Sequence, residues 1–257
     1  MSSTVATSVG TAVAVVAGLV ACVAVVGYAT GRGGVEHARY AVLRSVRASG
    51  HAGIAFELRR YAPCVAAVTR VEGGRGAETR RMTSRGFRNV AQYIFGGNAQ
   101  RASVAMTAPV VSAPLIGADA AGAAQPGGGR SIAMTAPVVS AAAGRGALEV
   151  SFLMPSRFQR ADELPEPLSR DVELRELPTR LEAVHAFGGA YADDAATLAM
   201  ARRLLAAMRA DGLSPAPGGA DVDGERVALR VFGYDPPWTL PWFRLNEISI
   251  VCADAPQ

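Results

Sequence analysis

The 257-residue chain contains no lysine, and each of its 26 basic residues is an arginine. This absence excludes P-loop nucleotide-binding proteins, pyridoxal enzymes and Schiff-base aldolases, whose chemistry needs a lysine amine. Histidine is nearly as scarce, with only His37, His51 and His185. The motifs HExxH, CxxC and GxSxG are missing, and no acid, base and nucleophile converge in the sequence. We therefore expect neither catalytic activity nor a metal site.

Cysteine and charge patterning are equally sparse. Cys22, Cys64 and Cys252 are too few and too widely spaced for a disulfide scaffold. Cys64 and Cys252 stand in apolar, strand-like runs, which predicts small buried side chains that could pair only if the fold brings them together. The net charge is only +4, and the arginines are scattered among acidic residues rather than gathered in a stripe with aromatics. This distribution does not favour nucleic-acid binding.

One long apolar run lies near the N-terminus. Val9 to Ala29 form 21 residues without a charge, which as a helix would span roughly 30 Å, enough to cross a bilayer. We therefore predict that residues 1–50 are a single-pass membrane anchor with its linker. Four arginines follow the run closely and none precedes it, which predicts that the main domain lies on the cytoplasmic side. An exported chain, or a chain lipid-anchored at Cys22, is the alternative.

The rest of the chain, residues 51–257, contains an internal duplication. The segment FELRRYAPCVAAVTRVEGG from Phe56 aligns with VELRELPTRLEAVHAFGGA from Val172 at an offset of 116. Each copy predicts two strands joined by a turn at a proline, then a helix over 78–95 or 194–211. A third strand is expected near Val104–Val111 and again near Val227–Gly233. The pattern predicts an α+β fold made of two β-β-α-β units, at about 54–114 and 170–252, with a cleft between sheet and helices.

A second, shorter repeat is nearly identical in its two copies. SVAMTAPVVSA at 103–113 recurs as SIAMTAPVVSA at 131–141, separated by a Gly- and Ala-rich segment typical of a flexible loop. Two interpretations are open. Either two equivalent strands present Met106 and Met134 to a ligand, or a local duplication extends one strand and only one copy is structural.

Several segments resemble the SOUL heme-binding protein family, in the family's order. The segments are 56–68, GFRNVAQYIFGGN at 86–98, both Met-Thr-Ala-Pro-Val blocks, SFLMPSRF at 151–158 with LPEP at 164–167, and YDPPWTLPWFRLNEISI at 234–250. The resemblance implies a distorted antiparallel β-barrel or open sheet with two helices. It also implies non-catalytic binding of heme or another tetrapyrrole in a shallow, largely apolar groove beside the first helix. The barrel is also similar to effector-binding domains of drug-responsive regulators, so another apolar or cationic ligand is the alternative.

The first helix offers side chains suited to such a ligand. Porphyrin carboxylates would pair with arginine, and the macrocycle would lie against methionine or tyrosine. The candidate ligand-binding residues are Arg81, Met82, Arg85, Arg88 and Tyr93. The alternative is a solvated basic helix face without a ligand. No histidine falls within a family motif, so no axial heme ligand is assigned, and His185 is expected to be a partly buried strand residue with a backbone partner.

Overall fold

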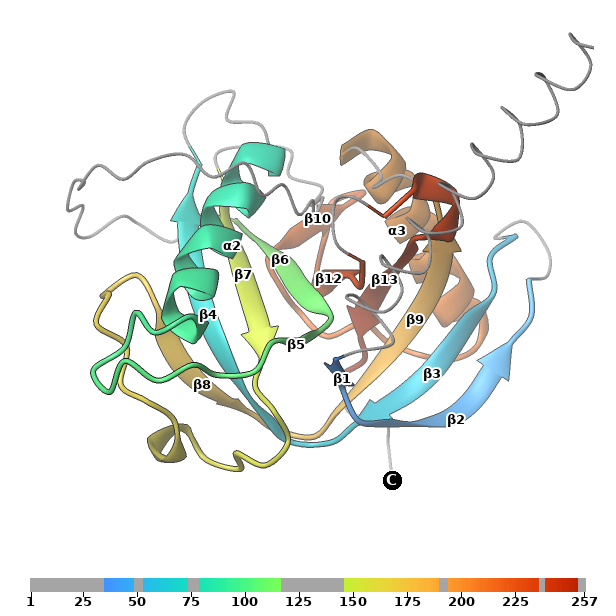
Figure 1. Ribbon diagram of the computed structural model, residues 1–257. Helices are drawn as coiled ribbons and strands as arrows, with labels where there is room; N and C mark the ends of the chain where they lie inside the picture. The colour runs from blue at the N-terminus through green and yellow to red at the C-terminus, as the bar shows by residue number, and fades with distance from the viewer. Residues whose placement is uncertain are drawn as a thin grey trace, which may run out of the picture.

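The main sheet has nine antiparallel strands and curls into an open half-barrel (Figure 1). The computed structural model describes residues 35–48, 53–73, 79–116, 146–189, 194–235 and 239–253. Two helices lie on one face of the sheet, α2 (Thr79–Ile94) and α3 (Asp194–Ala210). In spatial order the strands are β2 (Tyr40–Val46), β3 (Phe56–Tyr61), β9 (Arg180–Gly188), β13 (Leu245–Val251), β12 (Leu229–Gly233), β6 (Val110–Ile116), β7 (Gly146–Leu153), β4 (Cys64–Glu72) and β8 (Glu173–Leu177).

Shorter elements complete the domain. β1 (Glu36–His37) pairs in parallel with β5 (Thr107–Ala108), and β10 (Ala220–Val222) forms a hairpin with β11 (Glu225–Val227). Two 3₁₀ turns, η1 (Ala161–Glu163) and η2 (Pro241–Phe243), precede β8 and β13. The predicted α+β class is therefore confirmed, with an open sheet rather than a closed barrel.

The duplication appears as two units with the same order of elements. The first is β3-β4-α2-β6-β7 and the second is β8-β9-α3-β12-β13. Exchanging the units reverses the strand order of the sheet from β3 to β8, as a pseudo-two-fold axis requires. The first strand of each unit pairs with the other unit, β3 with β9 and β8 with β4. Each unit has a fifth element, β7 or β13, that the predicted β-β-α-β unit lacked.

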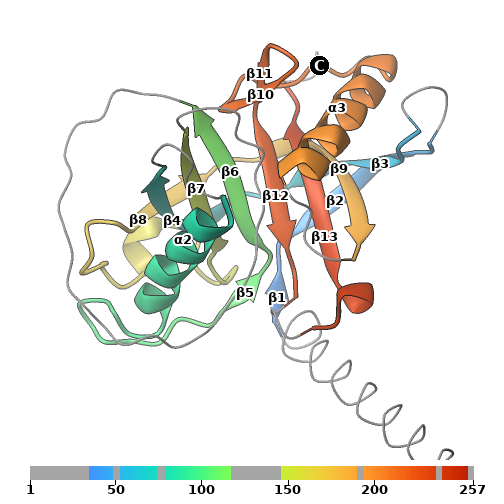
Figure 2. The ribbon, with the colours of Figure 1, turned by 90° about the horizontal axis from the view of Figure 1, so that it is seen from above.

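The helix positions follow from periodicity in the sequence. The predicted helices at 78–95 and 194–211 match α2 and α3 within one residue at each end. Figure 2 shows α2 lying over β4 and β7, and α3 lying over β9 and β13. Apolar side chains of each helix pack on alternate residues of the strands below and form one core cluster under that helix. At the N-terminal ends of the helices, Thr79 Oγ1 donates a hydrogen bond to Asp194 Oδ2 at 2.9 Å. This bond joins the first residues of the two helices.

One close contact fixes how α2 sits on the sheet. A Cβ atom added at Gly86 would lie 2.5 Å from Val150 Cγ2 and 2.8 Å from its Cβ, both on β7. Only glycine lets the helix come this near to the strand. Phe87 and Phe152 then pack with ring centroids 5.1 Å apart. Gly86 therefore determines the height of α2, and with it the position of the arginines on the outer side of the helix.

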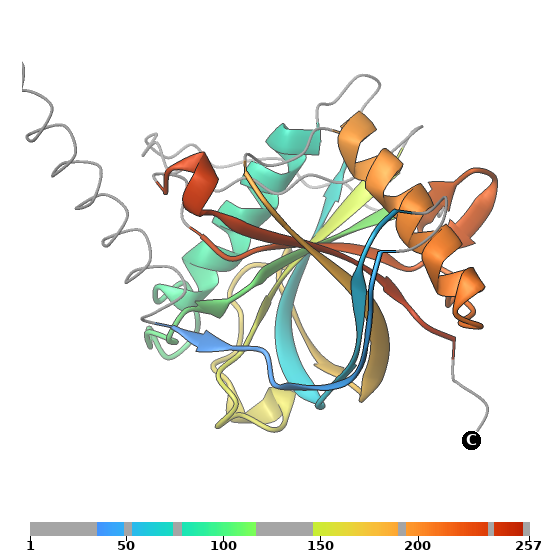
Figure 3. The same cartoon turned by 90° about the vertical axis from the view of Figure 1, so that its right-hand side faces the viewer.

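The opposite face of the sheet, which we call the inner face, is also buried. In β4, Val65 and Ala67 pack under α2, while Ala66 and Val68 point to the inner face. There they join Phe232 and Tyr234, together with Val35, Ala38 and Leu245 at the rim. The curl of the sheet (Figure 3) turns this face toward itself, so that side chains rather than solvent fill it.

Two predicted boundaries need correction. β1 and β2 lie before residue 50, and β2 pairs with β3 along its whole length, so the structured domain begins by residue 35 rather than at 51. Sheet pairing of 40–46 was not predicted because its side chains are largely exposed and show no alternation. The strand after the first helix was predicted near 104–111, but β6 begins only at Val110, because Val104 belongs to the loop that packs back on α2.

Some predicted features fall outside the described residues. These are the apolar run 9–29 with Cys22, His51, the second Met-Thr-Ala-Pro-Val copy, and most of the segment joining the two copies. Among the described residues, no helix is long and apolar enough to span a bilayer. The anchor therefore stays a prediction.

Candidate functional site

Three of the predicted ligand residues form one stripe on the exposed side of α2. Arg81, Arg85 and Arg88 are spaced by four and three residues, so the helix places them above one another, and all three are exposed. Arg85 and Arg88 form no ion pair with another described residue. The stripe continues through Gln92 to Phe95, which is 61% exposed. It therefore runs from guanidinium groups to an aromatic ring over roughly 20 Å.

The other two predicted ligand residues point elsewhere. Tyr93 is only 2% exposed, and its hydroxyl donates a hydrogen bond to the Pro165 carbonyl oxygen at 2.8 Å. Burial raises the pKa of Tyr93 to about 12. Met82 is half-buried and packs against the core cluster under α2. Buried Tyr93 does not fit the prediction that Met82 and Tyr93 flank a flat ligand beside the arginines, whereas Met82 keeps part of its surface exposed.

A rigid corner holds the apolar end of the stripe. Asn98 is fully buried, and its Nδ2 donates to the carbonyl oxygens of Tyr93 at 3.0 Å and Ala102 at 2.7 Å, while its Oδ1 accepts from the Ala102 amide at 2.9 Å. Asn98 also forms a β-bridge with Pro167, which places the exposed Leu168 near the end of the helix. Sequence reasoning missed Phe95 and Leu168, although both stand in or beside the quoted family motifs.

The histidines offer no assigned heme ligand in this region. His185 is half-buried in β9, and its Nδ1 lies 2.7 Å from the Ala55 carbonyl oxygen, as predicted for a strand histidine with a backbone partner. His37 stacks on Tyr234 with centroids 5.9 Å apart. Both are remote in sequence and element from α2. Within the described chain, His, Cys, Asp and Glu form no group of three that could hold a metal ion.

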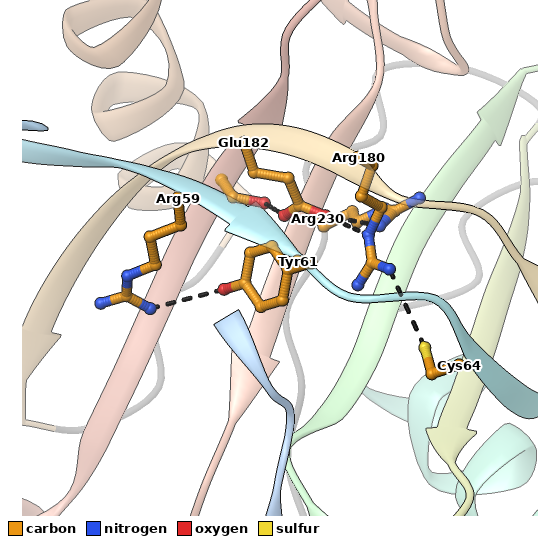
Figure 4. A network of polar contacts seen from close by, with 7 residues as sticks. Arg59, Tyr61, Cys64, Arg180, Glu182 and Arg230 are labelled. Carbon is orange, nitrogen blue, oxygen red and sulfur yellow. Dashed lines mark hydrogen bonds and ion pairs between the residues drawn. The ribbon is translucent and has the colours of Figure 1, made fainter. Parts of the chain in front are cut away.

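A second polar cluster, unforeseen from the sequence, lies on the inner face (Figure 4). Glu182 is fully buried in β9, and its Oε1 lies 2.6 Å from both Arg180 Nε and Arg230 Nη1. Its Oε2 accepts a hydrogen bond from Ser249 Oγ at 2.6 Å. Burial by itself opposes ionisation, but Arg230, Arg180 and the Ser249 hydroxyl outweigh it and lower the pKa of Glu182. The carboxylate is therefore held charged and fully partnered.

A matching carboxylate sits one strand away. Glu247 Oε1 lies 2.9 Å from Arg59 Nη1, and its Oε2 accepts a hydrogen bond from the Tyr234 hydroxyl at 2.6 Å. Burial and the neighbouring Glu247 charge raise the pKa of Tyr234, so it stays protonated. The ring of Tyr40 lies 4.3 Å from the Arg59 guanidinium and covers it. Each of these charged groups lies beside a group of opposite charge, so the cluster ties β3, β9, β12 and β13 together.

Two hollows lie elsewhere on the described surface. A cavity of about 40 Å³ opens beside Tyr61, Cys64 and Arg180 at the rim of the inner face, and is far too small for a tetrapyrrole. A wider hollow of about 350 Å³ lies between α3 and the β10–β11 hairpin, but it is bordered by the ion pairs Arg202–Asp223 and Arg209–Glu225. Neither contains a predicted ligand residue.

Cys64 and Cys252 are both free thiols, and burial raises the pKa of Cys252 to about 11.

Comparison with known families identifies the class of protein to which this fold belongs. The sequence profile described as SOUL heme-binding protein matches residues 35–251, most of the chain, so the protein belongs to the SOUL heme-binding protein family. The match begins at the same residue as the described domain. A search of curated protein sequences gave no significant match.

Several solved structures have a related chain path. The C-terminal domain of EcmrR is 10% identical, with a TM-score of 0.44, covering 77% of this chain and 96% of that one. EcmrR in its DNA complex is 9% identical, with a TM-score of 0.48, covering 77% and 57%. A putative transcription regulation protein from Staphylococcus aureus is 10% identical, with a TM-score of 0.38, covering 79% and 100%. At these values the likeness supports no functional argument.

Proposed function

We propose that the protein binds heme or a related tetrapyrrole, without catalysing a reaction, along the exposed stripe of α2. The observation that carries the proposal is the arrangement, in a member of this family, of Arg81, Arg85 and Arg88 in line with the exposed ring of Phe95. A tetrapyrrole has the same arrangement, with carboxylates at one edge and a flat apolar body. Each guanidinium can donate two parallel hydrogen bonds to a carboxylate.

The residues present define how such a ligand would be held. Arg85 and Arg88 would orient the carboxylates, while Phe95 and the nearby Leu168 would cover one face of the macrocycle. No histidine of α2 or its neighbouring loops stands ready as a fixed axial ligand. The proposal is therefore a shallow, carboxylate-directed site that tolerates more than one tetrapyrrole.

Titration of heme into the full-length chain in mild detergent, followed at the Soret band, tests the proposal. Arg85→Glu or Arg88→Glu should weaken binding roughly ten- to a hundredfold, because a charge-assisted hydrogen bond contributes about 1.5–3 kcal/mol. Arg226→Glu, the same charge change on the exposed surface of β11, is the matched control and should bind as the parent does. His185→Ala should also leave affinity unchanged.

Two results would contradict this site. Unchanged affinity in the α2 variants together with loss of binding in a histidine variant would move the site to that histidine. A lipophilic cation that binds more tightly than heme would favour the alternative ligand class. The arginine stripe argues against a cation, because like charges repel at this surface.

We further propose that residues 9–29 anchor this domain to a membrane, with the domain on the cytoplasmic side. Support comes from the 21 uncharged residues and from the arginines that follow them. A reporter active only outside the cytoplasm, fused after Gln257, should stay silent, and strong activity would instead favour export.

A further inference from the structure

Two large aromatic side chains are exposed side by side on one short turn. Trp242 is 67% exposed and Phe243 is 41% exposed, with ring centroids 6.3 Å apart. Both belong to η2, the turn that leads into β13. Neighbouring exposed aromatics on a folded domain usually mark a contact surface rather than chance exposure.

Hydrogen bonds hold the backbone of this turn, so the positions of the two rings on the surface are fixed. The Phe243 and Arg244 amides donate hydrogen bonds to the carbonyl oxygens of Leu240 at 2.9 Å and Pro241 at 3.1 Å. Arg244 Nε donates to the Thr239 carbonyl oxygen at 2.6 Å, and the Leu245 amide donates to Asp235 Oδ2 at 2.7 Å. These bonds fix the backbone on both sides of the aromatic pair.

The same end of the molecule holds the start of the described chain. Leu245, two residues after Phe243, packs in the inner-face cluster that also includes Val35 and Ala38. Figures 2 and 3 show β1 and the short red helix before β13 at one end of the domain, with the β10–β11 hairpin at the far end in Figure 2. The aromatic turn and residue 35 therefore share one surface.

The short segment between the apolar run and β1 limits how the domain can be oriented relative to a membrane. Only residues 30–35 separate the apolar run from β1, and six residues reach at most about 20 Å even when fully extended. A domain of this size is about twice that distance across. If residues 9–29 lie in a bilayer, as proposed above, the end that carries Val35 must be turned toward that bilayer.

We propose that Trp242 and Phe243 insert into the headgroup region of the membrane that anchors the chain. Trp is enriched at this depth because its ring is apolar and its indole N–H reaches the polar layer. Arg39, exposed in the link between β1 and β2, supplies positive charge toward anionic headgroups near the same end. The occupant of the surface is thus lipid, and the domain is docked at two points, the anchor and the aromatic turn.

Depth-dependent fluorescence quenching tests the docking in the full-length chain. The chain has two tryptophans, Trp238 and Trp242, so Trp238→Phe leaves Trp242 as the single reporter. The variant is reconstituted in vesicles of phosphatidylcholine and phosphatidylglycerol whose acyl chains carry bromine either near the headgroup or near the bilayer centre. Trp242 emission should shift to shorter wavelength and lose more intensity with the shallow label than with the deep one.

A matched control places the reporter at the far end of the domain. With both native tryptophans replaced by phenylalanine, Arg226→Trp on β11 should emit as in water and be quenched by neither label. If Trp238→Phe fails to fold, the difference between the unmodified chain and Trp242→Phe gives the same measurement.

The outcomes separate this inference from the anchor on which it rests. Chains that float with the vesicles while Trp242 is unquenched by either label overturn the docking and leave the anchor standing. Chains that do not float with the vesicles overturn both. A wavelength shift that depends on protein concentration, without quenching, would show contact between two copies and would also overturn lipid docking.

Discussion

At the scale of single residues, Gly86 is a position where the packing of α2 on β7 leaves no room for a side chain. Alanine is more favourable than glycine inside a helix by about 1 kcal/mol, so Gly86→Ala would stabilise α2 in open space. Here the new methyl group would overlap Val150, and overpacking of this kind costs about 1–3 kcal/mol. We expect the clash to win and the melting temperature, measured by scanning calorimetry, to fall by several degrees.

Gly188→Ala is the matched control, because its methyl group would meet only the Arg244 carbonyl oxygen at an ordinary 3.6 Å. Combining Gly86→Ala with Val150→Ala removes the 2.5 Å contact with Val150 Cγ2 and leaves only the 2.8 Å contact with its Cβ. The double variant should lose less stability than the two single changes together. A rise in melting temperature for Gly86→Ala alone would mean that α2 lies farther from β7 than described.

The buried carboxylate Glu182 gives a second prediction at this scale. Glu182→Gln leaves Arg180 and Arg230 without their shared counter-charge, and breaking a buried pair costs about 3–5 kcal/mol. Glu72→Gln in the exposed Arg70–Glu72 pair is the control, with a change within about 0.5 kcal/mol. Urea denaturation at neutral pH measures both.

The pH dependence of that stability has a definite sign. The pKa of Glu182 is lowered in the folded chain from its ordinary value of 4.5, so the folded state holds the proton less readily than the unfolded one. Its contribution is therefore complete above pH 4.5 and is lost as the pH falls below that value. Glu182→Gln should flatten this acid limb of the denaturation profile. An unchanged limb would assign the acid sensitivity to other carboxylates.

The helical periodicity of α2 is enough to predict which of the candidate ligand residues lie on the same side of the helix. At 3.6 residues per turn, Met82 and Tyr93 lie about 100–120° around the helix from the line of Arg81, Arg85 and Arg88. The helix and its arginine stripe were thus predictable from the sequence. The same helical angle also predicts that Met82 and Tyr93 point away from the arginine stripe, toward the body of the protein.

At the scale of elements, β2 protects the edge of β3. A chain beginning at residue 51 lacks β1 and β2, which leaves the hydrogen-bonding edge of β3 open and removes Tyr40 from Arg59. Open edges invite pairing between chains. We expect the 51–257 fragment to melt lower than the 35–257 fragment and to self-associate, as measured by light scattering after gel filtration. Equal melting temperatures and monomeric behaviour of the two fragments would show that β2 is dispensable.

The duplication predicted most elements, and its limits have physical causes. β3, β4 and α2 have counterparts at a constant offset, so their repeat is visible in the sequence. Residues 117–145 separate β6 from β7, whereas β12 and β13 are joined by a short link, so the offset changes and β7 and β13 were not recognised as equivalent. In β3, alternation correctly separates Leu58 from Arg59, but sequence alone could not show that the curled sheet buries both faces.

At the scale of the whole molecule, the two units share one sheet through exchanged strands. The first strand of each unit pairs with a strand of the other unit, β3 with β9 and β8 with β4, so neither unit forms all its strand pairs by itself. We therefore expect one unfolding transition, with calorimetric and van't Hoff enthalpies equal. Two resolved transitions would mean that the units are separate folding domains.

The exchanged strands also set an order of events on the ribosome. When the first unit has emerged, β4, β6 and β7 can pair with one another. The edge of β3 that does not pair with β2 has no partner until β9 is synthesised, more than a hundred residues later. At about 5–20 residues per second, that wait lasts of the order of ten seconds. Throughout it β3, with β2 beside it, is a two-stranded ribbon with an open edge, which by itself is only marginally stable. The nascent chain therefore passes through a stage in which strand Phe56–Tyr61, with its three apolar side chains Phe56, Leu58 and Tyr61, is available to chaperones, or to a neighbouring nascent chain, before the sheet closes over it.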